Sequence, residues 1–158
     1  MSDASFHDAD PAPLALKAED AEDLLIVSAL AQDAILPVGE IAYDRRRRCL
    51  ALLLNRFRWE DADQAARENR PYERVRAVMA VSDVLRVQSD GIDRKDTDLV
   101  LELLRIDWEP AEDGAGRVLL QFAGDGTLAL DVECLNIDLS DVTQPYVAPS
   151  GKAPRHPD

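Results

Sequence analysis

Histidine is almost absent from this sequence. Its 158 residues include two histidines, His7 and His156, and both lie in terminal stretches without hydrophobic periodicity. A catalytic serine or cysteine needs a neighbouring base, which is usually histidine. The sequence therefore predicts no Ser-His-Asp or Cys-His arrangement inside the fold. A zinc site would have to consist of cysteines and carboxylates alone, so we expect no metal.

Cysteine and glycine are also scarce. The two cysteines, Cys49 and Cys134, lie far apart among apolar neighbours, outside any Cys-x-x-Cys pair. We expect buried thiols that act as small hydrophobic side chains, with a disulfide or metal role as the alternative. The seven glycines form neither G-x-G-x-x-G nor a Walker loop, the motifs that cradle nucleotide phosphates, so no cofactor is expected. Gly124-Asp125-Gly126 instead predicts a hairpin turn.

Long apolar runs are missing as well. None approaches the roughly 20 residues that a membrane span needs. The first ten residues are acidic and lack the basic and apolar regions of a signal peptide. We therefore expect a cytoplasmic protein that does not bind membranes.

Basic residues are few and unevenly spread. The chain carries 18 lysines and arginines against 31 acids, which gives a net charge of −13. Residues 1–44 hold ten acids against one lysine, and residues 77–158 hold sixteen acids against seven basic residues. Residues 45–76 reverse the sign, with ten basic residues against five acids. The overall field opposes nucleic acid as a partner but leaves room for a local anion site in the middle segment.

The sequence does contain a clear succession of periodic segments. Acids crowd residues 19–23, with Asp20 as the expected N-cap, and a helix is predicted to run from there to about Gln32. Its apolar stripe at helical spacing consists of Leu24, Ile26, Val27, Leu30 and Ala31. Alternating patterns predict strands over Ile41–Asp44, Cys49–Trp59, Glu73–Val81, Val84–Val87, Leu99–Trp108, Val118–Phe122 and Leu128–Cys134. After a bulge, Leu135, Ile137 and Leu139 continue the apolar alternation on the other parity.

Cys49–Trp59 is the expected centre of the sheet. Its first six residues are all apolar, and a strand that is apolar on both faces needs cover on both sides. Leu53, on the face that stays apolar, is therefore expected in the core. The other face turns basic at Arg56 and Arg58, so the strand is expected to leave its covering element near Leu54.

Short connections between successive strands favour antiparallel pairing. We predict an α+β domain in which an N-terminal helix packs on a strongly bent antiparallel sheet or partial barrel of about six strands. The domain should span residues 14–143. Residues 1–13 are expected to be a flexible tail and residues 144–158 a disordered tail, since neither shows hydrophobic periodicity.

Five segments make the sequence similar to a known family. They are residues 18–24 (AEDAEDL), 32–34 (QDA), 38–43 (VGEIAY), 51–59 (ALLLNRFRW) and 131–134 (DVEC), and LNRFRW is the most specific part. Over about Leu14 to Val142 the chain resembles a small proteobacterial family, found mainly in alphaproteobacteria and classed as a domain of unknown function. The resemblance implies no activity. Members are often encoded near histidinol dehydrogenase, which implies no mechanism either.

The arginines of the middle segment are the main candidates for a binding site. They are Arg45, Arg46, Arg47, Arg48, Arg56 and Arg58. A guanidinium group presents a planar fork of donors that suits carboxylate and phosphate. Three interpretations stay open, in this order: pairing with acids of the same chain, docking of a protein partner's acidic surface, and binding of a small anion or nucleic acid.

Glu102 is the one acid inside an otherwise apolar strand, which makes it a candidate acid or base if it is buried. Pairing or exposure is the alternative. The first functional hypothesis is a non-enzymatic protein-interaction or regulatory domain. The second is a small-anion-binding module or an enzyme that uses arginine and glutamate. An enzyme should show Arg56, Arg58 and Glu102 converging in one pocket, whereas an interaction domain should show a flat or ridged patch.

Overall fold

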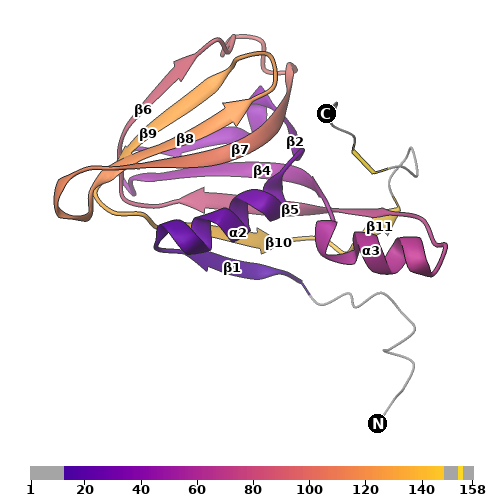
Figure 1. Ribbon diagram of the computed structural model, residues 1–158. Coiled ribbons are helices and arrows are strands. Elements are labelled where there is room, and N and C mark those ends of the chain that lie inside the picture. The colour runs from indigo at the N-terminus through magenta and orange to yellow at the C-terminus, as the bar shows by residue number, and fades with distance from the viewer. Residues whose placement is uncertain (1–12, 148–152, 155–158) are drawn as a thin grey trace.

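The structure, a computed structural model, describes residues 13–147 and 153–154. These residues form one antiparallel sheet of eleven strands with two α-helices (Figure 1). The predicted α+β class and the antiparallel pairing are therefore confirmed. The predicted number of about six strands is wrong.

The elements follow one another with short connections. The helices are α2 (Ala21–Ala31) and α3 (Trp59–Arg67). The strands are β1 (Ala15–Ala18), β2 (Ile35–Pro37), β3 (Ile41–Asp44), β4 (Cys49–Phe57), β5 (Glu73–Val81), β6 (Val84–Asp90), β7 (Val100–Pro110), β8 (Gly116–Phe122), β9 (Thr127–Val132), β10 (Ile137–Asp141) and β11 (Tyr146–Val147). Single 3-10 turns cover Val38–Glu40 and Glu112–Gly114.

The strands pair in the order β1-β10-β5-β4-β2-β7-β8-β9-β6, with β3 added to β4 and β11 added to β5. The sheet folds over itself, so that β7, β8, β9 and β6 face β4, β5, β10 and β1 (Figure 1). No ladder joins β1 to β6 among the described residues, so this part of the chain is not a closed barrel. The expected central strand is confirmed, because β4 lies between β5 and β2.

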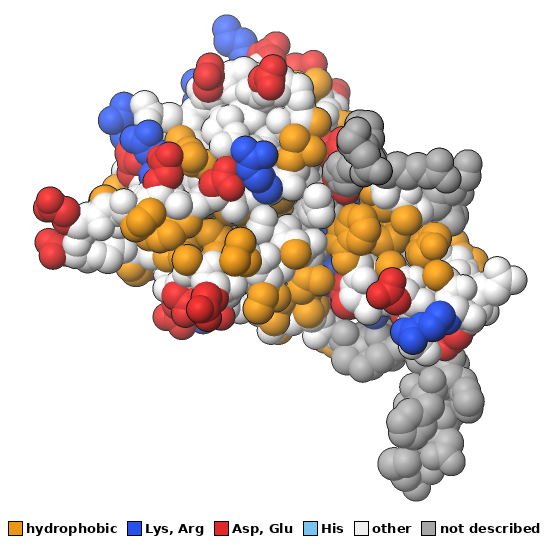
Figure 2. All heavy atoms as spheres, in the orientation of Figure 1, with side chains coloured by type: hydrophobic (Ala, Val, Ile, Leu, Met, Phe, Trp, Pro, Cys, Tyr) orange, Lys and Arg blue, Asp and Glu red, His pale blue; other side chains and the backbone are white. Residues whose placement is uncertain are grey.

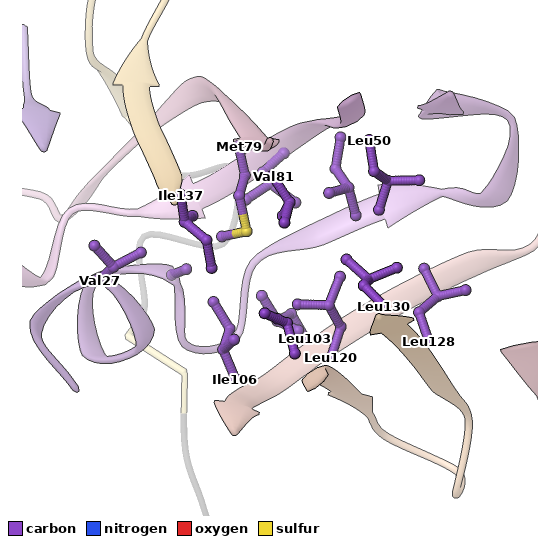
Figure 3. Packing of buried hydrophobic residues seen from close by; sticks show 14 of the residues in the cluster. Val27, Leu50, Met79, Val81, Leu103, Ile106, Leu120, Leu128, Leu130 and Ile137 are labelled. Carbon is purple, nitrogen blue, oxygen red and sulfur yellow. The ribbon is translucent and has the colours of Figure 1, made fainter. Parts of the chain in front are cut away.

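The hydrophobic core fills the space between the two layers. In Figure 3, Leu103, Leu120 and Leu130 from one layer point toward Met79 and Val81 from the other. These side chains are all nearly or fully buried, and they occupy alternate positions of their strands, as one-sided burial of a pleated strand requires.

Helix α2 lies across the open side of the folded sheet, where it packs on β1 and β7 (Figure 1). Asp20 caps it as predicted, since its Oδ1 accepts a hydrogen bond from the Asp23 amide at 2.8 Å. The helix is not the first element, because β1 precedes it and pairs with β10.

The predicted apolar stripe of α2 is only partly buried. Leu24, Val27 and Ala31 enter the core, but Ile26 is 55% exposed. Leu25, which was not part of the predicted stripe, is 72% exposed. Figure 2 shows hydrophobic side chains on this face of the molecule with charged groups around them. The helix is apolar almost all round, so its spacing alone did not identify the face that packs.

Three short strands were missed, although β3, which is as short as β1, was predicted. β1 has four residues, β2 has three and ends in Pro37, and β11 has two. β11 pairs with the start of β5, within the range 144–158 that was expected to be a tail. The rest of that range, apart from residues 153–154, lies outside the described residues. The predicted tail over 1–13, with the exception of Pro13, also lies outside them.

Candidate functional site

The six predicted arginines occupy opposite ends of β4. Arg45–Arg48 form the turn that joins β3 to β4, whereas Arg56 lies near the end of β4 and Arg58 directly precedes α3. The structure therefore divides the predicted cluster into two sites. β4 also ends at Phe57, two residues earlier than expected, because Trp59 begins α3.

Arg56 is fully buried and continues the inward-facing row of Leu52 and Leu54. Its Nη1 and Nη2 donate to the two carboxylate oxygens of Glu60 at 2.9 and 2.7 Å. Its Nε and Nη2 donate to the two oxygens of Asp141, both at 3.0 Å. With a further contact from Nη1 to the Phe57 carbonyl at 3.4 Å, all five donors of the guanidinium group have an acceptor.

The expectation that β4 leaves its cover near Leu54 is therefore wrong. α3 and the end of β10 cover the strand here, and they supply carboxylates instead of apolar groups. A buried charge is tolerated where it is paired and its hydrogen-bonding groups are satisfied. Arg56 meets both conditions.

Two more arginines extend this arrangement. Arg58 is almost buried and donates a short hydrogen bond to Glu73 of β5. Arg70 donates to both oxygens of Asp61 at 2.8 and 2.7 Å. We call the whole set the ion-pair network, which consists of Arg56, Arg58, Glu60, Asp61, Glu68, Arg70, Glu73 and Asp141.

The ion-pair network attaches α3 to the sheet. The helix buries Ala65 as its one apolar side chain, and its other buried residue is Asp61. Trp59, its first residue, donates its indole N–H to the Gln32 carbonyl at 2.8 Å and packs edge-on against Phe57. Because so little apolar surface is buried, we infer that charge pairing contributes much of the helix attachment.

The pKa values agree with a fully charged network. Burial is the largest single influence on the pKa of Glu60 and raises it. Hydrogen bonds from Arg56, a backbone hydrogen bond and the charges of Arg56 and Arg58 together outweigh burial, so the pKa lies below its usual range. Hydrogen bonds from Arg70 lower the pKa of Asp61. Burial would lower the pKa of Arg56, but its bonds to Glu60 and Asp141 raise it instead. Arg56 and Arg58 thus follow the first of the three interpretations, which is pairing within the chain.

The other site, the arginine hairpin, consists of residues 44–48. Asp44 Oδ1 accepts hydrogen bonds from the amides of Arg46 and Arg47, both at 3.1 Å, and so fixes the turn. The side chain of Arg47 is 85% exposed, and its Nε lies 3.7 Å from Asp44 Oδ2. Arg48 adopts a positive φ of 53° and pairs with Glu133 at 2.8 Å. No ion pair joins Arg45 or Arg46 to a carboxylate within the described ranges.

A shallow hollow of about 600 Å³ lies beside the arginine hairpin. Its lining combines the small side chains of Ala42, Cys49 and Ala51 with Tyr43, Asp44 and Arg45–Arg47. The Cys49 thiol is half-buried. Burial raises its pKa most, and the negative charge of Asp44 raises it further. It is therefore a neutral thiol at pH 7 and not an activated nucleophile.

Cys134 corrects the expectation of two buried thiols. It is exposed, and its Sγ contacts Asp83 Oδ2 at 3.2 Å, which raises the pKa of the thiol. The alternation that placed it in the core ends earlier, because β9 stops at Val132.

Glu102 is half-buried on the outer face of β7, opposite Ile35 of β2. Its charge acts on the nearby Arg74, whose pKa is lowered by burial and only partly restored by Tyr146, Asp33 and Glu102. Arg56 faces the core on the other side of the sheet. Arg56 and Glu102 therefore lie on opposite faces of the sheet.

Neither a metal-ligand cluster nor a membrane-spanning helix is found among the described residues. Their His, Cys, Asp and Glu side chains form no group of three or more that could hold a metal ion. Among the same residues, no helix is both long enough and apolar enough to cross a membrane.

Together, the folded-over antiparallel sheet and the helix across its open side define an α+β domain with a charge-paired second helix. Over residues 14–156 the sequence matches the family described as "Protein of unknown function (DUF2948)". The chain belongs to this family, which confirms the resemblance to a domain family of unknown function. No curated protein and no solved structure matches the chain.

Proposed function

We propose that the protein is a non-catalytic interaction domain that docks through the arginine hairpin onto an acidic segment of a partner protein. One observation carries this proposal: three arginines project from a tight turn of a molecule that is otherwise acidic. Arg45, Arg46 and Arg47 are all exposed. Asp44, the acid of the same turn, is engaged by the backbone amides of Arg46 and Arg47.

Charge favours a short acidic segment over a polyanion. The arginine hairpin holds four arginines and one aspartate, a local charge of +3, within a chain of charge −13. A long nucleic acid or an anionic membrane would meet repulsion from the remaining surface, whereas a short segment needs to meet the hairpin alone. Complementary charge of this kind mainly increases the association rate and the specificity.

The shape beside the arginine hairpin supports the same partner. Ala42 and Ala51 line the hollow with small side chains, so an extended chain can approach closely. The arginines of the lining can then take carboxylates in bidentate geometry. This ridge beside a shallow hollow fits the interaction domain predicted from the sequence. The alternative is an enzyme or anion-binding module built on Arg56 and Arg58. Arg56 has no N–H donor left for a ligand, because all five already have acceptors within the chain.

A direct binding measurement tests the proposal. The probe is a fluorescent decapeptide of alternating glutamate and glycine, followed by anisotropy at low and physiological salt. Replacing Arg46 and Arg47 with Ser should weaken binding at low salt by about tenfold, since two exposed charge contacts of up to about 1 kcal/mol each are lost. The matched control replaces Arg105 and Arg117, two exposed arginines outside the hairpin, with Ser.

Equal weakening by both double substitutions would reject a hairpin-specific site and leave only a general charge effect. No binding of the peptide to the unmodified chain at low salt would reject the proposed partner chemistry. A partner recovered from the native cell should be lost on Arg46→Ser with Arg47→Ser and retained by the control. It should also compete with the acidic peptide.

A further inference from the structure

A second opening lies between β3 and β6, and Tyr43 is the one lining residue that it shares with the hollow beside the arginine hairpin. It has a volume of about 370 Å³, within the range of small-molecule sites. We call it the slot. Its lining residues are Val38, Gly39, Ile41, Tyr43, Leu50, Val87, Ser89, Ile92, Arg94, Thr97 and Leu128.

The slot exists because two strand edges meet without pairing. Within the described part of the chain, β3 pairs with β4 alone and β6 pairs with β9 alone. The side chains between these edges lead inward to Leu50 and Leu128, which belong to the hydrophobic core. The folded sheet is thus open to solvent at this seam, as the mouth of a small barrel would be.

Hydrogen bonds close the slot at both ends. At one end, the Tyr43 hydroxyl donates to the Val84 carbonyl at 2.9 Å, and the Val84 amide donates to the Arg48 carbonyl at 2.8 Å. At the other end, the Gly39 amide donates to the Thr97 carbonyl at 2.9 Å. The stretch of β3 between these ends is only a few residues, on the order of 10 Å. A continuous peptide strand would have to cross one of these closures, so a compact molecule fits better.

The chemistry of the slot is apolar inside and cationic at the rim. Leu50 and Leu128 are buried at its floor, while Val87 and Ile92 are half-buried at its walls. Arg94 is exposed at the rim, and no ion pair joins it to a carboxylate within the described ranges. The other polar side chains of the lining are Ser89, Thr97 and Tyr43, whose hydroxyl donates to the Val84 carbonyl.

We propose that the slot binds a small molecule with an apolar body and one anionic group, of the class of medium-chain carboxylates. The hydrocarbon lies against Leu50 and Leu128, where it extends the core. The carboxylate lies at the rim and accepts hydrogen bonds from Arg94. Burying the hydrocarbon gives most of the affinity, and the guanidinium group selects an anion over a neutral head group.

The test uses octanoate and its neutral counterpart octanol as probes, with methyl NMR of the full chain. Octanoate should shift the methyl signals of Val87, Ile92 and Leu128 in a saturable way. Arg94→Gln should weaken octanoate binding by roughly three- to tenfold and leave octanol binding unchanged. Arg86→Gln is the matched control, because Arg86 is an exposed arginine of β6 that does not line the slot.

Substitutions that fill the slot with a bulky side chain test the binding site independently of Arg94. Val87→Trp should abolish the octanoate shifts, and Ser89→Phe serves the same purpose if the tryptophan variant does not fold. Octanoate shifts that do not saturate, or that centre on the exposed Leu25 and Ile26 of α2, would overturn the site. Equal effects of Arg94→Gln on octanoate and octanol would overturn the anionic assignment. None of these results depends on the acidic peptide, so this proposal and the hairpin proposal fail separately.

Discussion

The two ends of β4 carry arginines in opposite surroundings. At its start, the arginine hairpin projects Arg45, Arg46 and Arg47 into solvent. At its end, Arg56 is fully buried, and both Glu60 and Asp141 bind it through both carboxylate oxygens. At one end of β4 the guanidinium groups are therefore exposed to solvent, whereas at the other end the guanidinium group is paired with carboxylates of the same chain.

The difference lies in the carboxylates and not in the arginines. Arg56 is followed four residues later by Glu60 at the start of α3, and the chain brings Asp141 to the same place through the pairing of β10 with β5. Among residues 44–48 of the arginine hairpin, Asp44 is the one acid, and its carboxylate accepts hydrogen bonds from two backbone amides. A run of basic residues therefore indicates a binding site only after nearby acids have been assigned.

Breaking the buried end should give the largest effect. Arg56→Met keeps an apolar stem but removes the guanidinium group from Asp141, whose side chain is 4% exposed. Removing one member of a buried ion pair costs about 3–5 kcal/mol, because the remaining charge stays desolvated. We expect a loss of that size in the free energy of unfolding, measured by urea denaturation. Arg45→Met, the same change at the exposed end, is the control, and comparable losses in the two variants would contradict the comparison.

The middle of β4 carries two leucines that differ in burial and have no charge. Leu52 is almost fully buried in the core, whereas Leu53 is half-buried on the outer face, contrary to the sequence-based expectation. Leu52→Ala should cost about 2–5 kcal/mol and Leu53→Ala less than about 1.5 kcal/mol, because only the first opens a cavity in the core. Denaturation of the two variants side by side would test this order. If Leu53→Ala cost as much as Leu52→Ala, the outer face would need a cover of its own.

Acid should weaken the buried end selectively. The pKa values of Glu60 and Asp61 are lowered in the folded protein. Their contribution is therefore fully present above the unfolded values of about 4.3 and 3.9, and it is lost as pH falls through the lower folded values. The stability difference between the unmodified chain and Glu60→Gln should shrink as pH falls from 7 toward 3.5. A difference that stays constant over this range would mean that Glu60 does not act as a charged partner.

Much of the fold follows from local patterns. The cap at Asp20, the strand over Glu73–Val81 and the hairpin turn at Gly124-Asp125-Gly126 each depend on neighbours in sequence, and all three occur as predicted. The extra strands do not carry such a signal. β2, for example, is only three residues long and is a strand because β4 and β7 lie on either side of it.

The candidate site was harder to predict from the sequence than the fold. The spacing of Arg56 and Glu60 is a local signal that could have indicated a pair, but Asp141 lies 85 positions away and joins only through sheet pairing. The slot has no local signal at all. It arises because β3 and β6 meet without forming a ladder, a property of the folded sheet and not of either strand.

The smallest effect on stability is expected at the exposed end. Arg46→Ser combined with Arg47→Ser should change the free energy of unfolding by less than about 0.5 kcal/mol. Exposed ion pairs contribute about 0–1 kcal/mol, and Arg47 meets Asp44 only at 3.7 Å with most of its side chain in solvent. The turn itself should survive, since Asp44 binds the backbone amides of both residues whatever their side chains are.

Urea denaturation at low and high salt provides the measurement, because any remaining charge contribution should fade as salt screens it. A loss above about 1 kcal/mol that persists at high salt would show that the hairpin arginines hold the fold together, as Arg56 does. The two ends of β4 would then share one structural role. If stability holds while binding of the acidic peptide falls, the hairpin arginines are free of a structural role, and their place on the surface is explained by a partner.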